Sequence, residues 1–184
     1  KDHIKIAELI DLKSIDKILK LLTNLQKRKG RLFVLGVGGS AGNASHAVND
    51  FRKLCGIEAY SPADNVSELT ARTNDDGWEY VFSKWLETSK LSNRDMLLFF
   101  SVGGGSLSRN VSVNLIKAAK FAKKRKSKIA SVIGRKEGYL KKISDACCII
   151  PLVNKRSITP HTETYQVFIW HMLVSHPKLQ VKKT

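Results

Sequence analysis

The feature that most constrains the fold of this chain is an apolar run that ends in a cluster of glycines. Residues 31–51 read RLFVLGVGGSAGNASHAVNDF, so a short apolar run is followed by Gly36, Gly38, Gly39 and Ser40. A strand, a glycine turn and a helix in this order leave the first N–H groups of the helix without internal partners. Such groups bind anions. The stretch therefore predicts a strand–turn–helix unit with an anion site at the turn.

Two side chains of catalytic type lie on the helix predicted here. His46 and Asp50 are four residues apart, which places them on one face of a helix. A histidine on a helix is often an ordinary core or surface residue, but His46 directly follows the anion turn and is paired with a carboxylate. The functional interpretation is therefore favoured. His161 and His176 border prolines, and we expect them in loops.

Strand-like apolar runs alternate with helical patterns along the rest of the chain. The expected strands cover residues 32–35, 96–102, 129–133 and 147–152. The expected helices cover residues 15–25, 45–54, 81–86, 111–122, 139–143 and 163–175. Continuous apolar strands between helices are typical of a parallel sheet covered on both faces. We expect one α/β domain over residues 1–184: a doubly wound parallel sheet flanked by helices, with an N-terminal helix before the core.

A second glycine turn, SVGGGSLS at residues 101–108, follows another predicted strand. Ligands of doubly wound sheets bind at the carboxyl ends of the strands, where this turn and the one at residues 36–42 would meet. Tight turn geometry alone can explain one such segment. Two of them, each after a strand and before a helix, favour one phosphorylated ligand held between them.

The composition limits the classes of function. No apolar run approaches the roughly 20 residues that span a bilayer, and the first residues lack the apolar region of a secretory signal. The three cysteines, Cys55, Cys147 and Cys148, form no CxxC pair, so we expect buried free thiols rather than a cysteine zinc site. These features predict a cytoplasmic protein without a membrane partner.

The net charge of +16 leaves one alternative open. Part of it lies in the basic run at residues 117–129, which could neutralise nucleic-acid phosphates. Lysines near the end of a helix are also favoured by the helix dipole, and a solvated helix face is the preferred interpretation. Nucleic acid is therefore an unexpected partner, but not an excluded one.

Four segments in one order carry a resemblance to a known family. They are GVGGSAGNASHAVNDF (36–51), ELTARTNDDGWEYVFSKWL (68–86), FSVGGGSLSRNVSVNLIKAAKFAKKR (100–125) and TETYQVFIWHML (162–173). Together they span nearly the whole chain, which resembles the SIS (sugar isomerase) fold family. The glycine turns are shared by many SIS proteins, whereas the histidine-bearing helices and the NDxG turn narrow the resemblance to the phosphoheptose isomerase branch.

The resemblance implies an aldose–ketose isomerase that acts on a sugar phosphate, most simply sedoheptulose 7-phosphate. A proton moves between C1 and C2 through an enediol, which requires a base, an acid and stabilisation of the enediolate. The resemblance also implies zinc as a cofactor, and a homotetramer whose active sites are completed by neighbouring subunits.

Roles for individual residues follow from the same resemblance. Asp50 is expected to be the catalytic base and His171 the acid, while His46, Asp50, Glu163 and His171 match the metal site. Two histidines and two carboxylates are a donor set that suits zinc. The residues expected to bind substrate and phosphate are Gly38, Gly39, Ser40, Asn74, Asp75, Ser101, Gly103, Gly104 and Ser106.

The chain departs from the family pattern at three places. Its second turn begins SVGGGS, where the family usually has STSGNS, so two hydroxyls and an amide are lost. Asp50 replaces a glutamate and Glu163 replaces a glutamine. These changes favour a divergent member with a different sugar. They also leave open a non-catalytic SIS protein that binds sugar phosphates or regulates a partner, as relatives linked to replication initiation do.

Overall fold

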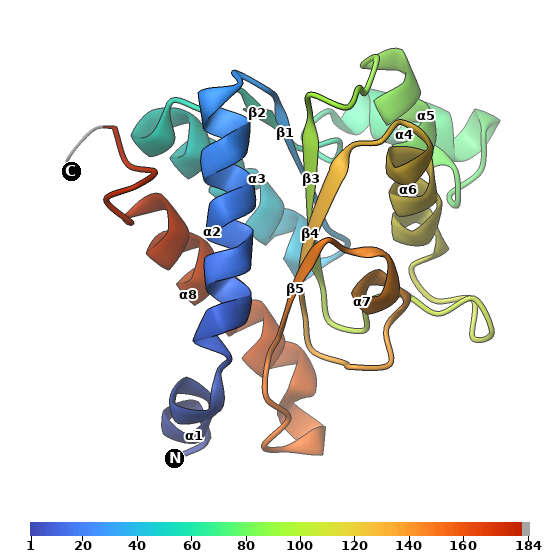
Figure 1. Ribbon diagram of the computed structural model, residues 1–184. Coiled ribbons are helices and arrows are strands. Elements are labelled where there is room, and N and C mark those ends of the chain that lie inside the picture. Colours follow the sequence, from blue (N-terminus) through green and yellow to red (C-terminus); the bar gives the residue numbers. More distant parts are fainter. Residues whose placement is uncertain (182–184) are drawn as a thin grey trace.

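The protein, described here for residues 1–181 by a computed structural model, has a single parallel sheet in the order β2-β1-β3-β4-β5 (Figure 1). The strands are β1 (Leu32–Leu35), β2 (Ala59–Tyr60), β3 (Met96–Ser101), β4 (Lys128–Ile133) and β5 (Ala146–Ile149). The α-helices are α1 (Asp2–Leu9), α2 (Leu12–Lys27), α3 (Gly39–Cys55), α4 (Val66–Asp75), α5 (Val81–Thr88), α6 (Val113–Lys124), α7 (Tyr139–Ile143) and α8 (Ile158–Val174). This arrangement confirms the doubly wound α/β fold predicted from the sequence.

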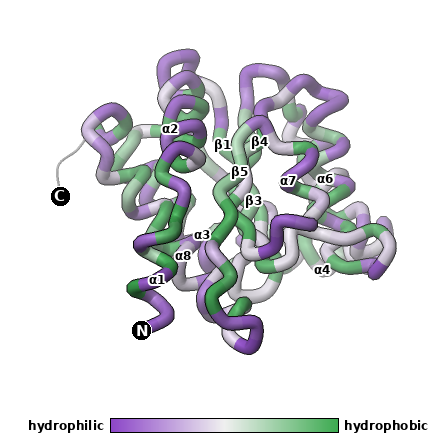
Figure 2. Tube along the Cα trace, turned by 60° about the horizontal axis from the view of Figure 1, so that its bottom comes forward, coloured by the Kyte–Doolittle hydropathy of each residue, from purple (hydrophilic) through white to green (hydrophobic). Residues whose placement is uncertain are grey.

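Helices cover both faces of the sheet. In Figure 1, α2, α3 and α8 lie on one side of the strands, and α5, α6 and α7 lie on the other. Along β3 the side chains alternate between the two cores: Met96, Leu98 and Phe100 face the first, while Leu97 and Phe99 face the second. Burial on both faces explains why the strands are apolar without interruption. Figure 2 accordingly shows hydrophobic residues concentrated along the central strands.

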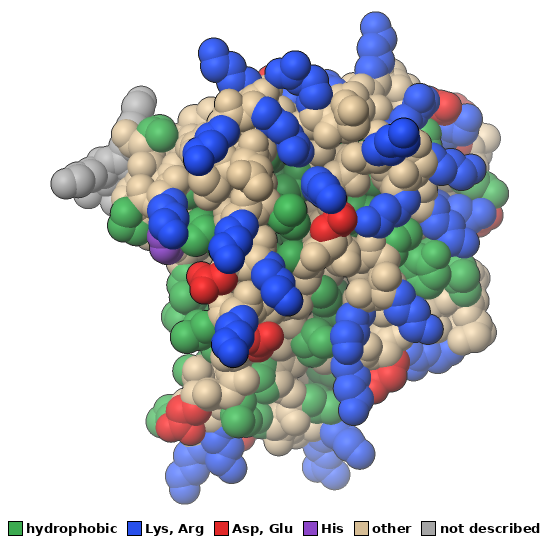
Figure 3. Space-filling view, in the orientation of Figure 1, with side chains coloured by type: hydrophobic (Ala, Val, Ile, Leu, Met, Phe, Trp, Pro, Cys, Tyr) green, Lys and Arg blue, Asp and Glu red, His purple; other side chains and the backbone are tan. Residues whose placement is uncertain are grey.

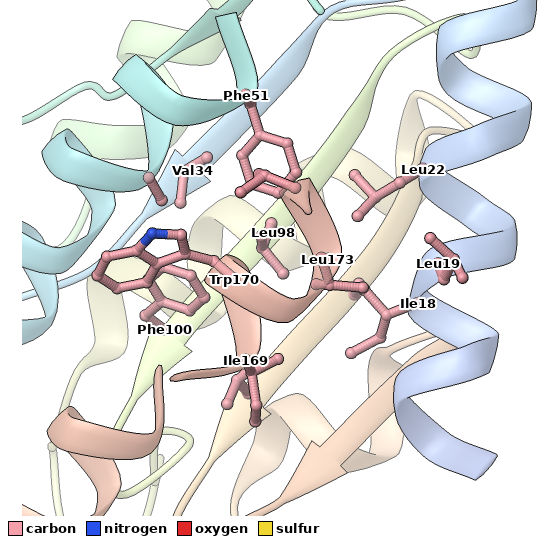
Figure 4. Close-up of a cluster of buried hydrophobic side chains, with 14 of the residues drawn as sticks. Ile18, Leu19, Leu22, Val34, Phe51, Leu98, Phe100, Ile169, Trp170 and Leu173 are labelled. Atoms are coloured by element: carbon pink, nitrogen blue, oxygen red, sulfur yellow. The ribbon is translucent and has the colours of Figure 1, made fainter. Parts of the chain in front are cut away.

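The core on the α8 side is built around one large side chain. Trp170 is fully buried, and its ring stacks on Phe100 of β3 with 5.7 Å between ring centroids. Figure 4 shows Leu173 of the same helix directed toward Ile18 of α2. The apolar face of α8 is thus held between the sheet and α2.

The strand order places both glycine turns at one point. β1 lies between β2 and β3, so the chain leaves β1 toward one side of the sheet and leaves β3 toward β4 on the other. Such a switch in direction opens a crevice at the carboxyl ends of the two strands. The turns after β1 and β3 therefore flank the same crevice.

Several details differ from the sequence-based expectations. The helix α8 begins at Ile158 rather than at residue 163, because Pro160 is tolerated in a first helical turn. His161 is therefore a buried helical residue, and its prediction as a loop residue was wrong. β5 ends at Ile149, before Pro151, which cannot donate to a strand ladder. The short elements α1, β2 and α4 were not predicted.

The three cysteines are free thiols, as expected. Cys55 and Cys148 are buried, and burial raises the pKa of Cys55 to about 12 and that of Cys148 to about 11. Within residues 1–181, no helix is both long and apolar enough to cross a membrane.

A buried ion pair ties the starts of β1 and β3 together. Asp95 is almost fully buried, and its carboxylate accepts hydrogen bonds from the Arg31 guanidinium at 2.9 and 3.2 Å and from the Arg31 backbone N–H at 3.1 Å. Ser92 donates two more hydrogen bonds through its backbone N–H and its hydroxyl. Burial raises the pKa of Asp95, but these hydrogen bonds outweigh it and hold the pKa below its ordinary value.

We expect Asp95→Asn to lower the free energy of unfolding by about 3 kcal/mol, because it leaves Arg31 without its charge partner. A depressed pKa stabilises the folded state above the unfolded pKa of about 3.9 and ceases to do so as the pH falls through the folded value. Urea unfolding between pH 7 and pH 3 should therefore show a smaller loss of stability in the variant. Equal pH dependence of the two proteins would contradict this assignment.

Candidate active site

Three side chains of metal-ligating type come together between α3 and α8. The Oδ2 atom of Asp50 lies 3.6 Å from Nε2 of His46 and 3.4 Å from Nε2 of His171. One ligand atom from each residue lies within 4.8 Å of the other two. The side chains of His46 and His171 are 56% and 46% exposed, whereas that of Asp50 is 12% exposed. The carboxylate thus forms the floor of a site that is open on the imidazole side.

Two hydrogen bonds fix the Asp50 carboxylate. The indole N–H of Trp170 donates to Oδ2 at 3.0 Å, and the Asn49 amide donates to Oδ1 at 3.1 Å. Since Trp170 is itself immobilised in the core, the floor of the site is rigidly connected to the packing between α8 and β3. The sequence predicted Trp170 as a residue of an apolar helix, but not its hydrogen bond to Asp50.

The hydrogen bond of the His171 ring determines which of its nitrogens is available. Nδ1 lies 2.9 Å from the backbone carbonyl oxygen of Val167, and a carbonyl can only accept. Nδ1 therefore carries a proton, and Nε2 faces Asp50. Histidines that bind metals usually donate their second N–H in this way.

The donor set of this cluster fits a divalent cation. Two imidazoles and one carboxylate are the protein ligands of many catalytic zinc sites, in which a further position stays open for water or substrate. The exposed side of the cluster provides such a position.

Glu163 does not belong to this three-residue cluster. Its carboxylate is the nearest group to Gly39, with its atoms 2.6–2.7 Å from where a Cβ of that residue would stand. It therefore lies at the first turn of α3, where the helix dipole favours a negative charge. The role of Glu163 as a fourth metal ligand stays a prediction.

A buried polar network joins α8 to the start of α3. The Asn43 amide donates to Oε1 of Gln166 at 2.8 Å and to the Glu163 backbone carbonyl at 3.0 Å. Gln166 in turn donates to the Ser40 hydroxyl at 3.0 Å. Gln166 and Ser40 are almost fully buried. Gln166 was only a weak candidate from the sequence and Asn43 was not one, because their pairing depends on how the two helices dock.

A cavity of about 330 Å³ occupies the crevice between the two glycine turns. Ser40 and Ser101 are buried residues of its wall, and the exposed residues Arg109 and Arg135 also line it. The full lining is Val37, Ser40, Ser101, Val102, Gly103, Arg109, Val111, Ser112 and Arg135. The sequence analysis missed the two arginines, because nothing in their spacing shows that they face one cavity.

The other predicted phosphate-binding residues lie around this cavity. Gly38 and Gly39 begin α3 beside Ser40, and Gly104 adopts a left-handed φ of +67° in the second turn. Ser106 forms an isolated bridge with Val111, which lines the cavity. Their contact with a ligand stays a prediction.

Asn74 and Asp75 lie elsewhere. Both are exposed at the end of α4, where the Asn74 amide donates to the Asp75 carboxylate at 2.8 Å. Neither residue lines the cavity or joins the histidine cluster. A role for them in substrate binding stays a prediction.

Comparison with known proteins shows the family. No protein-family model matches the chain. The phosphoheptose isomerase of Helicobacter pylori strain P12 is 32% identical over 172 residues, which cover 88% of this chain and 83% of that protein. The chain belongs to the phosphoheptose isomerase family. Lincomycin biosynthesis protein LmbN of Streptomyces lincolnensis is 33% identical, although the match spans only 59% of that protein.

Solved structures of the phosphoheptose isomerase family share the fold. The enzyme from Francisella tularensis superimposes with a TM-score of 0.80, at 22% identity, over 94% of this chain and 88% of that one. Phosphoheptose isomerase GmhA from Neisseria gonorrhoeae gives a TM-score of 0.79 with the same identity and coverage. The whole of the sheet and its helical layers is therefore a phosphoheptose isomerase architecture.

We expect Trp170→Phe to lower the free energy of unfolding by about 1–2 kcal/mol, because the nearly buried Asp50 carboxylate loses a hydrogen bond. Trp85→Phe is the matched control, since within residues 1–181 the Trp85 indole donates no hydrogen bond to another side chain. Urea unfolding measures both variants. An equal effect of the two substitutions would show that packing, rather than the bond to Asp50, carries the contribution of Trp170.

Proposed function

We propose that this protein is a phosphosugar isomerase that interconverts sedoheptulose 7-phosphate and an aldose heptose 7-phosphate. The observation that carries the proposal is the His46–Asp50–His171 cluster, two of whose residues lie on α3, the helix that begins at the cavity. Membership of the phosphoheptose isomerase family supports it. The cluster supplies groups for proton transfer, and the cavity supplies donors for a phosphate.

The spacing of the two regions along α3 suits a seven-carbon sugar. Ser40 and His46 are six residues apart, a rise of about 9 Å along a helix axis. Six carbon–carbon bonds of about 1.5 Å each give a zigzag of roughly 7–8 Å from C1 to C7. A phosphate near Ser40 would therefore leave C1 and C2 close to the histidine cluster.

In the proposed reaction, the Asp50 carboxylate takes a proton from C1 of the ketose and returns it to C2. Nε2 of His171 takes the proton of the C1 hydroxyl and delivers it to the oxygen on C2. The intermediate between the two transfers is an enediol, and the product is the aldose. Trp170 and Asn49 hold the carboxylate in place, and general acid–base catalysis of this kind contributes about 10²–10⁴-fold to a rate.

We also propose zinc as the cofactor, with His46, Asp50, His171 and Glu163 as the candidate ligands. Because Nδ1 of His171 is hydrogen-bonded to Val167, binding of the metal by Nε2 would compete with proton transfer by the same atom. Bound zinc would supply Lewis-acid stabilisation of the charge that develops on the substrate oxygens. Oδ2 of Asp50 faces both imidazoles, whereas Oδ1 accepts only from Asn49 among the described residues. The carboxylate thus has one oxygen for the cation and a second for the proton.

A cytoplasmic homotetramer is the assembly that we propose, with residues 1–184 as one domain. Phe168 and Met172 support an interface at this site, because they flank His171 on α8 and are 47% and 37% exposed. A neighbouring subunit would cover these side chains and enclose the imidazole side of the cluster. Asn74 and Asp75 would then reach the substrate only within the assembly. Light scattering after size exclusion tests the number of subunits.

The charge distribution gives little support to the nucleic-acid alternative. Figure 3 shows lysines and arginines spread over the whole visible face, with acidic side chains between them, rather than gathered over one element. Charges dispersed in this way are typical of a solvated protein surface, whereas a nucleic-acid site would gather them in one patch.

We expect Asp50→Asn and His171→Ala to lower kcat/KM for sedoheptulose 7-phosphate by at least about 10²-fold. Asn keeps the hydrogen bond from Trp170, so a folding defect is not expected. His176→Ala is the control, because His176 lies in the turn after α8 and outside the cluster. Turnover by Asp50→Asn at the rate of the unaltered protein would contradict the role of this carboxylate.

Elemental analysis should find about one zinc per chain in the purified protein, and less in His46→Ala and His171→Ala. Chelation should abolish turnover, and added zinc should restore it. Protein without metal and without activity on any ketose phosphate would overturn the proposed function.

A further inference from the structure

We propose that Arg109 and Arg135 bind the phosphate of the substrate in the cavity between the glycine turns. They would replace the side-chain donors that the second turn lacks. This inference rests on the proposed function for the identity of the ligand, but the anion site itself is defined by the cavity and its lining.

The second turn offers a dianion few side-chain donors, because none lies between Ser101 and Ser106. Residues 102–105 read VGGG and carry no polar side chain. The two buried hydroxyls of the cavity are partly used, because Ser40 accepts from Gln166 at 3.0 Å and Ser101 accepts from the Gly104 N–H at 3.0 Å. Each hydroxyl keeps its own proton to donate. Neutral donors alone, whether hydroxyls or backbone N–H groups, carry no full charge to compensate that of a phosphate dianion.

The two arginines reach the cavity from different strands. Arg109 follows β3, and its backbone N–H and its Nε both lie 3.4 Å from the Ser106 hydroxyl, which anchors the stem of the side chain. Arg135 comes two residues after the end of β4, next to Gly134, whose N–H donates to the Val102 carbonyl at 3.0 Å. The Arg109 guanidinium is therefore held beside the second turn, and the backbone next to Arg135 is held there too, with both side chains exposed.

Neither guanidinium is neutralised by a carboxylate. Within residues 1–181, Arg109 and Arg135 form no ion pair, in contrast to Arg31 and Arg72. Arginine presents N–H groups in a planar fork that matches phosphate oxygens, and such charge-assisted bonds are about twice as strong as neutral ones. Two arginines without a carboxylate partner line one cavity with Ser40 and Ser101, and together these residues can supply charge and hydrogen-bond donors to a phosphate.

The Glu163 carboxylate affects where in the cavity a phosphate can bind. Its carboxylate lies beside Gly39, at the first turn of α3, and repels an anion from that side. Arg109 and Arg135 line the cavity together with the second turn. The phosphate is therefore expected between Ser40 and the second turn, on the side of the cavity away from Gly39.

The test measures binding by calorimetry, with inorganic phosphate, sedoheptulose 7-phosphate and unphosphorylated sedoheptulose as probes. Arg109→Gln and Arg135→Gln should each weaken binding of the two phosphate probes by about tenfold, and the double variant by about a hundredfold. Binding of sedoheptulose should change less than twofold. Arg→Lys variants should recover part of the loss, since they keep the charge without the fork.

Lys136→Gln is the matched control, because it removes one positive charge next to Arg135 and does not line this cavity. Circular dichroism and urea midpoints verify that each variant is folded. Binding by the double variant equal to that of Lys136→Gln overturns the proposal, and so does a lack of phosphate binding by the unaltered protein. Loss of phosphate binding in the arginine variants of a protein without isomerase activity would refute the proposed function alone.

Discussion

The hydrogen bond between the Trp170 indole and the Asp50 carboxylate connects the core of this protein to its site. Trp170 stacks on Phe100 at the centre of the sheet, so the position of the sheet determines the position of the indole N–H. That N–H holds the carboxylate toward which both imidazoles are directed. A nearly buried carboxylate is stable only with such partners. The packing of α8 and the geometry of the cluster therefore depend on the same side chain.

The second constraint is the strand order. Because β1 and β3 are neighbours whose connections leave in opposite directions, their glycine turns flank one crevice. The helix α3 starts at that crevice and carries His46 and Asp50 away from it toward α8. One helix thus relates the anion cavity to the histidine cluster. This relation gives the two regions a fixed separation, which a sugar phosphate of matching length can span.

The parts of the fold that could be predicted are those whose sequence pattern lies within one short segment. The β1–α3 unit was predictable, because its glycines and its His–Asp spacing lie within twenty-one residues. The spacing of apolar residues likewise predicted four of the five strands and most of the helices. The start of α8 was placed too late, since Pro160 reads as a breaker although a first turn accepts it. β2 was missed because a two-residue strand has no periodicity.

The site was predicted only where the family resemblance supplied the partners. His171 lies beside Asp50, but Glu163 lies at Gly39, and Asn74 and Asp75 are exposed at the end of α4. Trp170, Asn43, Arg109 and Arg135 gave no usable signal, because their contacts depend on how distant segments dock. The single-domain assignment stays a prediction. The architecture was therefore predictable from pattern, and the contacts that determine its chemistry were not.

The separation of Asp50 and Trp170 by 120 residues has a consequence for how the protein matures. During synthesis, the residues of the sheet and of both glycine turns emerge before those of α8, so His46 and Asp50 lack their partners until α8 has been made. Closing a loop of that length carries an entropic cost, which the burial of Trp170 must offset. Docking of α8 is therefore the step that completes both the core on its side of the sheet and the histidine cluster.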